Sequence, residues 1–479
     1  MEIIKKLKPT FDFIHELETN YQMRGLPFAE RASTLTLNVR SLRLDFKIKT
    51  KDALNLSNVV RFNDFLIQNK NNSKCFIVSK KNHYLNSTIN TLGTDEENCS
   101  CSINISHLME EMWVKEGKYF YRFVFPIERD YWTHDINTLT YHTDRLWSRG
   151  LILIKFPEGV LHTYPIHGSN SHYIVVDSLF ACTYDDMQKY IYAISLSLGL
   201  ATSIITFDYA YVFAGNDALF DKDILCGFAE MRPTIKGQYK FFTTNMYSLR
   251  EMLKDNNVKY ASGQFYDEKG IFLAHLQDWI QLDEFERIVL MLYNNEELAR
   301  AVLILIESST MSLDYEGAMC AVALETICSA MYKPKQKTLM KNEDWKRNVV
   351  PKFENLIQSL IDSNTISEMH ADIIRRKLNG LNMDTNADKL SKPFECIGYN
   401  LTESDKKNIA KRNRFLHGNI VGHTHQESFD EILYTCMEIQ KLCAVLLFRN
   451  AGFKGLIVNN AVLMGLKRAV DEQEPVLIG

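Results

Sequence analysis

The residue types in this sequence that are best suited to chemistry lie in one basic stretch, Lys406–Gly418. In an α-helix, Asn413 and His417 would be four positions apart and share one face. Arg412 would lie about 140° round the helix from His417, so its long side chain reaches the imidazole if the last turn loosens near Gly418. A His at a helix C-terminus is favoured in its protonated form and exchanges protons near neutral pH. A neighbouring guanidinium binds phosphate or stabilises the charge of a phosphorane.

These residue types predict metal-free cleavage of RNA, in which the ribose 2′-hydroxyl attacks and the enzyme supplies proton transfer and positive charge. The alternative interpretation is an ordinary surface helix with a basic face and a capping His. A second Arg-x4-His occurs at Arg129–His134, after Phe125-Pro126 in an aromatic-rich stretch. Neither a helical pattern nor a basic face accompanies that copy, so context favours Arg412 and His417.

The basic stretch carries the sequence signals of a helix with defined ends. Thr402 is the predicted N-cap, with Asp405 three residues on, and Gly418 suits the position after the last turn. This helix would place the cations and the His on one element.

A second predicted helix carries an acid in an apolar environment. Glu325 lies within Ala318–Cys328, which is otherwise almost entirely apolar. One interpretation is that its carboxylate pairs with a cation of the basic helix, since a buried charge needs a partner. The other is that Glu325 lies on a solvated edge.

Two further His residues leave a third possibility open. His423 and His425 follow the basic stretch and could join His417 in a site of three imidazoles for a metal ion. The spacing is unusual for such a site, and the intervening segment contains flexible glycines.

Composition limits the function classes that the chain can belong to. With 479 residues, 46% hydrophobic and 24% charged, it has the make-up of a globular protein of two or three domains. Its net charge of −4 gives no overall attraction for nucleic acid, so RNA contacts require a local patch. The ten cysteines are scattered, which favours free thiols in a reducing cytosol. Met1–Lys8 is followed by no apolar h-region, so we expect no signal peptide. Tyr190–Phe207 is short for a membrane span, and we therefore expect a cytoplasmic protein without membrane contact.

Periodicity divides the chain into a β-rich N-terminal half and a helical C-terminal half, which predicts the α+β class. Alternation is clear over Thr34–Ile48, and a helix is predicted over residues 185–201 within this half. Residues 1–30 are mixed and are predicted to be a loosely attached start. The predicted domains are residues 1–270 (β-rich), 280–455 (an all-α bundle) and 456–479 (a C-terminal tail). Helices of the bundle are predicted at 284–294, 296–309, 315–332, 343–362, 367–378, 403–417 and 428–448, with Pro393 between helices.

The C-terminal half resembles the HEPN superfamily of ribonucleases, because Arg-Asn-x3-His followed by Gly lies on its penultimate long helix. The stretch Lys411–Gly418 and the Ala-Leu-Glu helix ending near Tyr332 look most like the Apea-like HEPN family. In that family a β-rich domain precedes the bundle. The motif part of the resemblance covers about residues 285–450, and for the first 270 residues it rests on layout alone.

The resemblance implies a metal-independent endoribonuclease without a cofactor, a toxin of antiviral defence that acts by abortive infection. His417 would move protons at the 2′-oxygen or the leaving oxygen, Arg412 would hold the scissile phosphate, and Asn413 would orient either of them. Further residues expected to contribute are Lys407, Lys411 and Arg414, which would bind RNA, and Glu325, which would support the site.

The resemblance also implies a homodimer with a composite cleft. Because a toxic nuclease needs restraint, we expect the N-terminal domain to gate the enzyme until a phage-derived or small-molecule trigger binds. Since the family includes catalytically silent members, the alternative is a non-catalytic HEPN module that binds RNA or nucleotides or mediates dimerisation.

Overall fold

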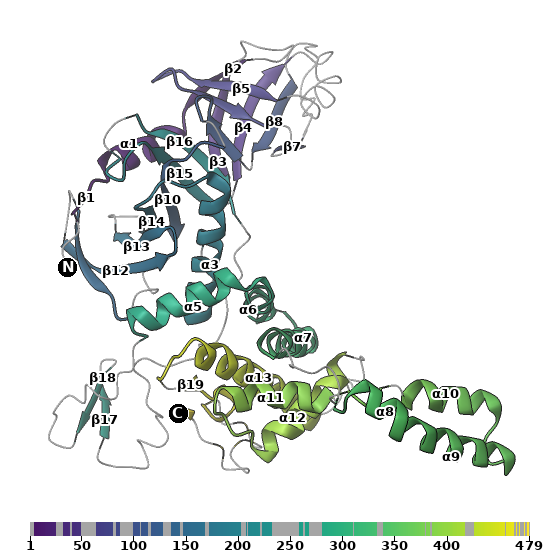
Figure 1. The fold of residues 1–479 in the computed structure, drawn as a ribbon. Coiled ribbons are helices and arrows are strands. Elements are labelled where there is room, and N and C mark those ends of the chain that lie inside the picture. The colour runs from purple at the N-terminus through teal and green to yellow at the C-terminus, as the bar shows by residue number, and fades with distance from the viewer. Residues whose placement is uncertain are drawn as a thin grey trace.

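The computed structural model of the chain has a large sheet in its N-terminal half and helices in its C-terminal half (Figure 1), which confirms the predicted α+β class. The structure describes residues 4–24, 32–38, 41–48, 64–79, 83–86, 99–105, 107–113, 116–127, 136–143, 147–167, 172–202, 207, 209–220, 223–231, 258–261, 264–267, 280–309, 311–332, 339–378, 380–383, 386–416, 426–455, 457–463, 466, 469, 474 and 477–478.

Within these residues, sixteen strands join in one sheet in the order β1-β11-β12-β13-β14-β10-β15-β16-β9-β6-β5-β2-β3-β4-β8-β7. The named pairs are antiparallel except β1 with β11. Two small two-stranded sheets, β17–β18 and β19–β20, stand apart from it. The strands are β1 (Ile4–Lys5), β2 (Asn20–Arg24), β3 (Ala32–Asn38), β4 (Ser41–Ile48), β5 (Phe65–Asn69), β6 (Cys75–Val78), β7 (His83–Asn86), β8 (Cys99–Ile105), β9 (His107–Glu110), β10 (Phe120–Ile127), β11 (Leu139–Thr143), β12 (Trp147–Phe156), β13 (Gly159–His167), β14 (His172–Ser178), β15 (Tyr209–Gly215), β16 (Leu225–Glu230), β17 (Val258–Ala261), β18 (Gln264–Asp267), β19 (Ile457–Val458) and β20 (Leu477–Ile478).

The central strand β10 shows how the sheet is covered on both faces. Successive side chains of a strand point to opposite faces. Tyr121, Phe123 and Phe125 pack into the core that includes helix α3 (Tyr184–Thr202). Val124 belongs to the core on the other face, to which helix α1 (Lys8–Leu17) contributes. The sheet is therefore a middle layer between the two helices (Figure 1).

The predicted loose attachment of residues 1–30 is wrong for α1. This helix is amphipathic and buries Phe11, Phe13, Ile14 and Leu17 against the sheet. The buried Arg122 of β10 fixes it in place, because the guanidinium donates to the carbonyl of Lys6 and to Thr10 Oγ1, at 2.7 and 3.0 Å. The short apolar face is interrupted by charged residues, so composition alone concealed it.

The C-terminal half contains most of the helices that periodicity predicts, with two differences. The predicted helix at 343–362 breaks at Val349, before Pro351, because proline cannot donate a backbone hydrogen bond. A helix was missed around Pro393, which lies inside it. The helices are α5 (Leu282–Asn294), α6 (Glu296–Ser308), α7 (Leu313–Met331), α8 (Asn342–Asn348), α9 (Val350–Asp362), α10 (Glu368–Leu378), α11 (Asn386–Cys396), α12 (Glu403–Leu416), α13 (Gln426–Asn450) and α14 (Asn460–Leu463).

The sheet and the bundle share one hydrophobic core. It runs from β10 and α3 through α5 and α6 to α7 and α13, without a polar layer between the two halves. The predicted boundary at residues 270–280 lies mostly outside the described residues and stays a prediction. The shared core means that neither half would keep its apolar surface covered alone.

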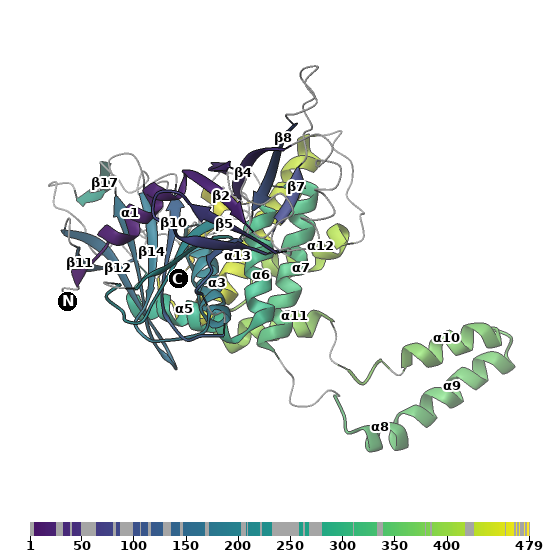
Figure 2. The ribbon, with the colours of Figure 1, turned by 90° about the horizontal axis from the view of Figure 1, so that it is seen from above.

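Helices α8, α9 and α10 project from the bundle as an arm, which both views show extending away from the sheet and from α13 (Figures 1 and 2). We define the arm as residues 339–383. Among the helices of the described chain, none is both long enough and apolar enough to cross a membrane.

Candidate functional site

Helix α12 begins with the predicted cap. The backbone N–H of Asp405 donates to Thr402 Oγ1 at 3.1 Å, and the N–H of Thr402 donates to Asp405 Oδ2 at 2.9 Å. This reciprocal pair satisfies two donors that the first turn would otherwise leave free. The start of the basic helix is therefore fixed.

One face of α12 is buried and the other faces solvent. The buried positions are Asp405, Asn408, Ile409, Arg412 and Phe415, spaced as on one side of a helix. The ring of Phe415 packs directly on α7 at Gly317, where a Cβ would collide with the ring. Neither end of the fully buried Asn408 amide has a hydrogen-bond partner among the described residues, although a buried amide normally has one. Close packing on α7 thus sets the rotation of α12 and turns Arg412 inward.

Arg412 is held by two acceptors. Its Nε lies 3.0 Å from Oε1 of Glu325 on α7, and its Nη1 donates to the carbonyl of Ile409 at 2.8 Å. The predicted pairing of Glu325 with a cation of the basic helix is confirmed. The competing interpretation is also partly correct, because 44% of the Glu325 side chain is exposed, against 7% for Arg412.

The structure brings Arg412 and Glu325 together, and of the other predicted site residues it describes the side chains of three. Asn413 and Lys407 are exposed on α12. The ammonium of Lys411 is paired with Glu431 of α13 at 2.8 Å. The side chain of Arg414 lies outside what the structure describes, as do His417, His423, His425 and the whole of Arg129–His134.

A pocket of about 360 Å³ adjoins the Arg412–Glu325 pair. Three elements line it: α7 and the residue after it, α11, and α12. A face of the Tyr332 ring carries the ammonium of Lys392, 5.3 Å from the ring centre. The lining of the pocket itself combines the cations of Lys389 and Arg412 with a carboxylate, a serine hydroxyl and the ring of Tyr332. Its lining residues are Glu325, Cys328, Ser329, Tyr332, Lys389, Leu390 and Arg412.

The cysteine in this pocket is unsuited to nucleophilic chemistry. Burial raises the pKa of the Cys328 thiol to about 12, and Arg412 only partly offsets this. The nucleophile of a cysteine enzyme is the thiolate, which Cys328 does not form near neutral pH. Its Sγ instead faces the carbonyl of Leu390 at 3.7 Å. Cys328 therefore joins α7 to α11 and lines the pocket.

The part of the chain that the structure describes contains no group of three or more His, Cys, Asp or Glu arranged to hold a metal ion. The three imidazoles suggested by sequence, His417, His423 and His425, lie outside that part. The metal-site alternative stays a prediction.

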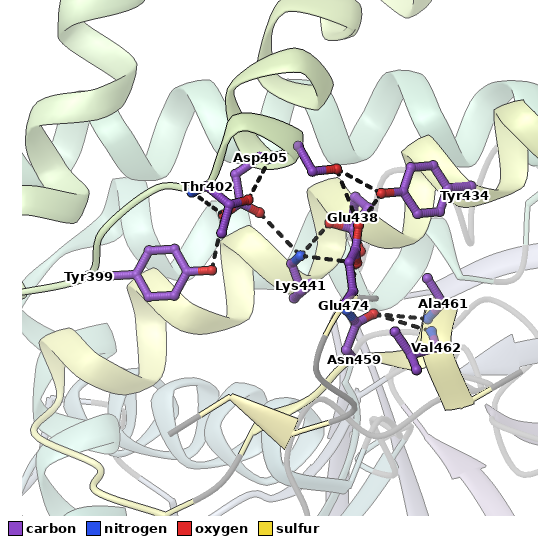
Figure 3. Close-up of polar contacts among 11 residues, drawn as sticks. Tyr399, Thr402, Asp405, Tyr434, Glu438, Lys441, Asn459, Ala461, Val462 and Glu474 are labelled. Carbon is purple, nitrogen blue, oxygen red and sulfur yellow. Dashed lines mark hydrogen bonds and ion pairs between the residues drawn. The ribbon is translucent and has the colours of Figure 1, made fainter. Parts of the chain in front are cut away.

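A second polar cluster lies in the bundle around Lys441 of α13 (Figure 3). Its ammonium lies 3.1 Å from Asp405 Oδ1 and 3.9 Å from Glu474 Oε2, and it also contacts Glu438 Oε2. Burial raises the pKa of Glu438 to about 8. Burial alone would lower the pKa of Lys441, but Glu438, Asp405 and Glu474 outweigh it and raise that pKa. With one ammonium facing three buried carboxyl groups, the cluster retains a proton on Glu438 at neutral pH.

This cluster links the cap of α12 to the C-terminal tail. Asp405 both closes the first turn of α12 and neutralises Lys441. Glu474 accepts from Asn459 at 2.9 Å, and its other oxygen contacts the Tyr434 hydroxyl. The Lys441 cluster therefore positions α12 rather than forming an open site.

Sequence inspection missed the pocket and the Lys441 cluster for different reasons. Tyr332 and Lys389 meet only through the tertiary fold, and no local pattern marks them. Glu438 and Lys441 did carry a signal, since two opposite charges three apart interrupt the apolar run of α13, as a buried pair would.

No protein-family model matches this chain, and neither curated proteins nor solved structures provide a match.

Proposed function

We propose that the chain is a metal-independent endoribonuclease of the HEPN type. The observation that carries the proposal is the placement of Arg412, whose guanidinium is fixed by Glu325 in the wall of a pocket. His417 follows this helix directly, one residue beyond its end at Leu416. The sequence motif lies at the C-terminal end of α12, and Arg412 of that motif lines the pocket. Both observations support this end of the helix as the site.

In the proposed reaction the 2′-oxygen attacks the adjacent phosphorus, the bond to the 5′-oxygen breaks, and a 2′,3′-cyclic phosphate forms. His417 would take the 2′-hydroxyl proton or protonate the leaving 5′-oxygen, steps that general acid–base catalysis accelerates about 10²–10⁴-fold each. The guanidinium of Arg412 would hold the phosphate and the charge of the transition state.

The contacts of Arg412 are compatible with that role. Glu325 and Ile409 use Nε and Nη1, and Nη2 has no hydrogen-bond partner among the described residues. A pocket of about 360 Å³ falls within the range of small-ligand sites and suits one nucleotide unit. Tyr332 and Lys389 would then contact the base and a neighbouring phosphate.

Cleavage of total cellular RNA by the purified chain in excess EDTA tests the proposal. Wild type is compared with His417→Ala and with His15→Ala, an exposed His of α1, as the matched control. We expect products with cyclic-phosphate or 3′-phosphate ends from wild type and His15→Ala only. Loss of cleavage in EDTA that returns with a divalent metal would instead favour the site of three imidazoles.

The second candidate function is non-catalytic binding of RNA or nucleotides by the same bundle. It is favoured by the paired state of Arg412 and Lys411, since both cations already have carboxylate partners. Binding that His417→Ala leaves unchanged, with no cleavage by either chain, would support this function. If the chain is a ribonuclease, the His417→Ala variant should still bind RNA with similar affinity but should no longer cleave it.

The wider context is part of the proposal. We infer a cytoplasmic homodimeric toxin of antiviral defence that acts by abortive infection, restrained by the β-rich half until a phage-derived or small-molecule trigger binds. The shared core supports the restraint, because α3 of the β-rich half packs on α5 and α6 of the bundle. Bacteria expressing wild type should stop growing only on phage challenge, while cells with His417→Ala should lyse.

A further inference from the structure

The arm exposes an unusual share of apolar surface. Seven of the twelve large hydrophobic side chains that are exposed in the described chain lie within residues 339–383. Soluble proteins seldom expose apolar residues in groups unless the surface binds something. The seven are Leu339, Met340, Leu356, Met369, Ile373, Leu381 and Met383.

Helix α10 has two apolar sides, of which one is covered. Ala371 and Leu378 are buried at 0% and 4% exposure on the side that packs on α9. Met369 and Ile373 lie four positions apart on the opposite side, about 180° round the helix, and are 68% and 38% exposed. A helix that is apolar on two sides normally packs between two partners. Among the residues that the structure describes, the outer side of α10 therefore has no packing partner.

Four of the exposed apolar residues lie where the arm joins the bundle, at its root (residues 339–352 and 375–383), and hydrogen bonds hold them in place. Asn382 joins the two chain segments of the arm's root: its carbonyl accepts from the N–H of Leu339 at 2.8 Å, and its side chain binds both backbone groups of Met340. Leu339 and Met340 are thus held beside Leu381 and Met383. Preorganised apolar side chains lose little entropy when they are covered.

Charge is segregated along the arm. The tip, residues 358–372, has three carboxylates (Asp362, Glu368 and Asp372) and lacks Lys and Arg. The root, residues 339–352 and 375–383, has seven Lys and Arg against two carboxylates. Arg375 is used within the arm, where it pairs with Glu354 and Asp372 at 3.0 Å and with Glu368 at 3.8 Å. The remaining six root cations have no ion-pair partner among the described residues: Lys341, Lys346, Arg347, Lys352, Arg376 and Lys377.

We propose that a second copy of this chain docks on the arm, with the two arms antiparallel and the outer sides of the α10 helices in contact. Turning one arm end for end places each acidic tip over the partner's basic root and brings Met369 and Ile373 of both copies together. A surface that is complementary to itself in this way is what a two-fold symmetric interface requires. Complementary charge also fixes the register of such a contact.

The arm contact adjoins the candidate pocket. Helix α11 begins at Asn386, directly after the root, and contributes Lys389 and Leu390 to the lining. Docking of the arms would therefore hold the pockets of two copies at a defined separation. The inference does not rest on the proposed ribonuclease activity, because the surface is defined by exposure and charge alone.

The mass of the full chain in solution, measured by sedimentation over a range of concentrations and salt, tests this inference. One variant reverses the tip (Asp362→Lys with Glu368→Lys) and another reverses the root (Arg376→Glu with Lys377→Glu). The control reverses two exposed cations of the body (Lys189→Glu with Arg300→Glu). The same charges also complement the dipole of α10, so mass rather than helix content is the readout.

We expect wild type and the control to dimerise, with weaker association at high salt. Each reversed variant alone should associate at least about tenfold more weakly, and an equimolar mixture of the two should regain most of the affinity. Only folded chains can regain it, so the mixture also excludes misfolding. A monomeric wild type, or a dimer that neither reversal weakens, would overturn the proposal. Dimerisation through the arm without RNA cleavage would support the arm contact and count only against the proposed ribonuclease activity.

Discussion

Nε of Arg412 lies 3.0 Å from Oε1 of Glu325, although 87 positions separate the two residues in sequence. The pair joins α12 to α7 at the pocket. The arginine is almost wholly covered, whereas the carboxylate is partly in water. Glu325 therefore directs the guanidinium while its own charge remains partly solvated.

Glu325→Gln tests this directing role. The amide keeps an acceptor near Nε but removes the charge, so the guanidinium is less firmly held. We expect kcat/KM for RNA to fall about tenfold to a hundredfold, the usual cost of a misplaced catalytic group. The free energy of unfolding should fall by only about 1 kcal/mol, because Glu325 is partly exposed.

Cleavage rates and urea unfolding measure the two effects. Glu296→Gln, which alters an exposed acid of α6, is the control and should change neither by much. Unchanged cleavage by Glu325→Gln would show that Arg412 is placed by its helix alone.

Gly317→Ala should displace α12. Alanine in a helix is normally more favourable than glycine by about 1 kcal/mol, but here the new methyl group would collide with the ring of Phe415. We expect a net loss of about 1–3 kcal/mol, as for other overpacked cores, together with reduced cleavage. Thermal and urea unfolding measure the loss.

The second change Phe415→Leu should recover part of that loss, because it removes the ring that collides. Gly380→Ala is the matched control, since a Cβ there approaches only the carbonyl of Lys377, at 3.4 Å. If Gly317→Ala stabilised the chain, α7 and α12 could not be packed as closely as the contact between Gly317 and Phe415 requires.

The Lys441 cluster predicts pH-dependent stability. The pKa of Glu438 rises from 4.5 to about 8 on burial, so between these values the folded state binds a proton that the unfolded state does not. The free energy of unfolding should therefore fall as pH increases from about 5 to 8, by on the order of a few kcal/mol.

Glu438→Gln should remove most of this dependence, because the amide imitates the protonated carboxyl group. Urea unfolding at several pH values measures it. Glu403→Gln is the control, since Glu403 is exposed and its neighbour Lys406 lowers its pKa. Parallel pH profiles for wild type and Glu438→Gln would contradict a buried proton at this site.

The ion pair of Arg122 and Asp177 predicts a large stability effect in the sheet. The two residues face each other on β10 and β14, with Nε 2.8 Å from Oδ1, and both are almost fully buried. Arg122→Met removes the buried guanidinium that pairs with the carboxylate of Asp177, whose hydrogen bonds also include one from the Tyr164 hydroxyl. We expect a loss of about 3–5 kcal/mol.

The double variant Arg122→Met with Asp177→Leu should lose less than Arg122→Met alone, because it also removes the buried carboxylate that paired with the guanidinium. Arg43→Met removes the exposed pair with Asp45 and should cost less than about 1 kcal/mol. Equal losses at Arg122 and Arg43 would exclude a special role for the buried pair.

Local signals in the sequence predicted local structure well. The cap at Thr402 and Asp405 and the helices of the bundle follow from side-chain type and period, which act over a few residues. The break at Val349 and the helix around Pro393 did not follow, because proline indicates a boundary without deciding which residue it ends. The order of the strands was also beyond prediction, since β9 meets β16 more than a hundred positions later in the chain.

The candidate site was predictable only in part, for a related reason. Arg412 and Glu325 are each conspicuous, one within a basic helix and the other within an apolar one, so their pairing could be suggested. Tyr332, Lys389 and Leu390 are ordinary residues until α7 and α11 are brought together. The surface of the arm was missed because exposure depends on what fails to pack, which a periodic pattern does not reveal.

The docking of α1 has a consequence for synthesis of the chain. Its partners include Arg122 and, through that residue, Asp177 of β14, which the ribosome adds about 160 residues after α1 is complete. At roughly 5–20 residues per second, Phe11 and Phe13 wait on the order of ten seconds or more for their later partners, Tyr173 and Phe213. During that interval the nascent chain presents a short amphipathic helix without its sheet, the kind of segment that chaperones bind.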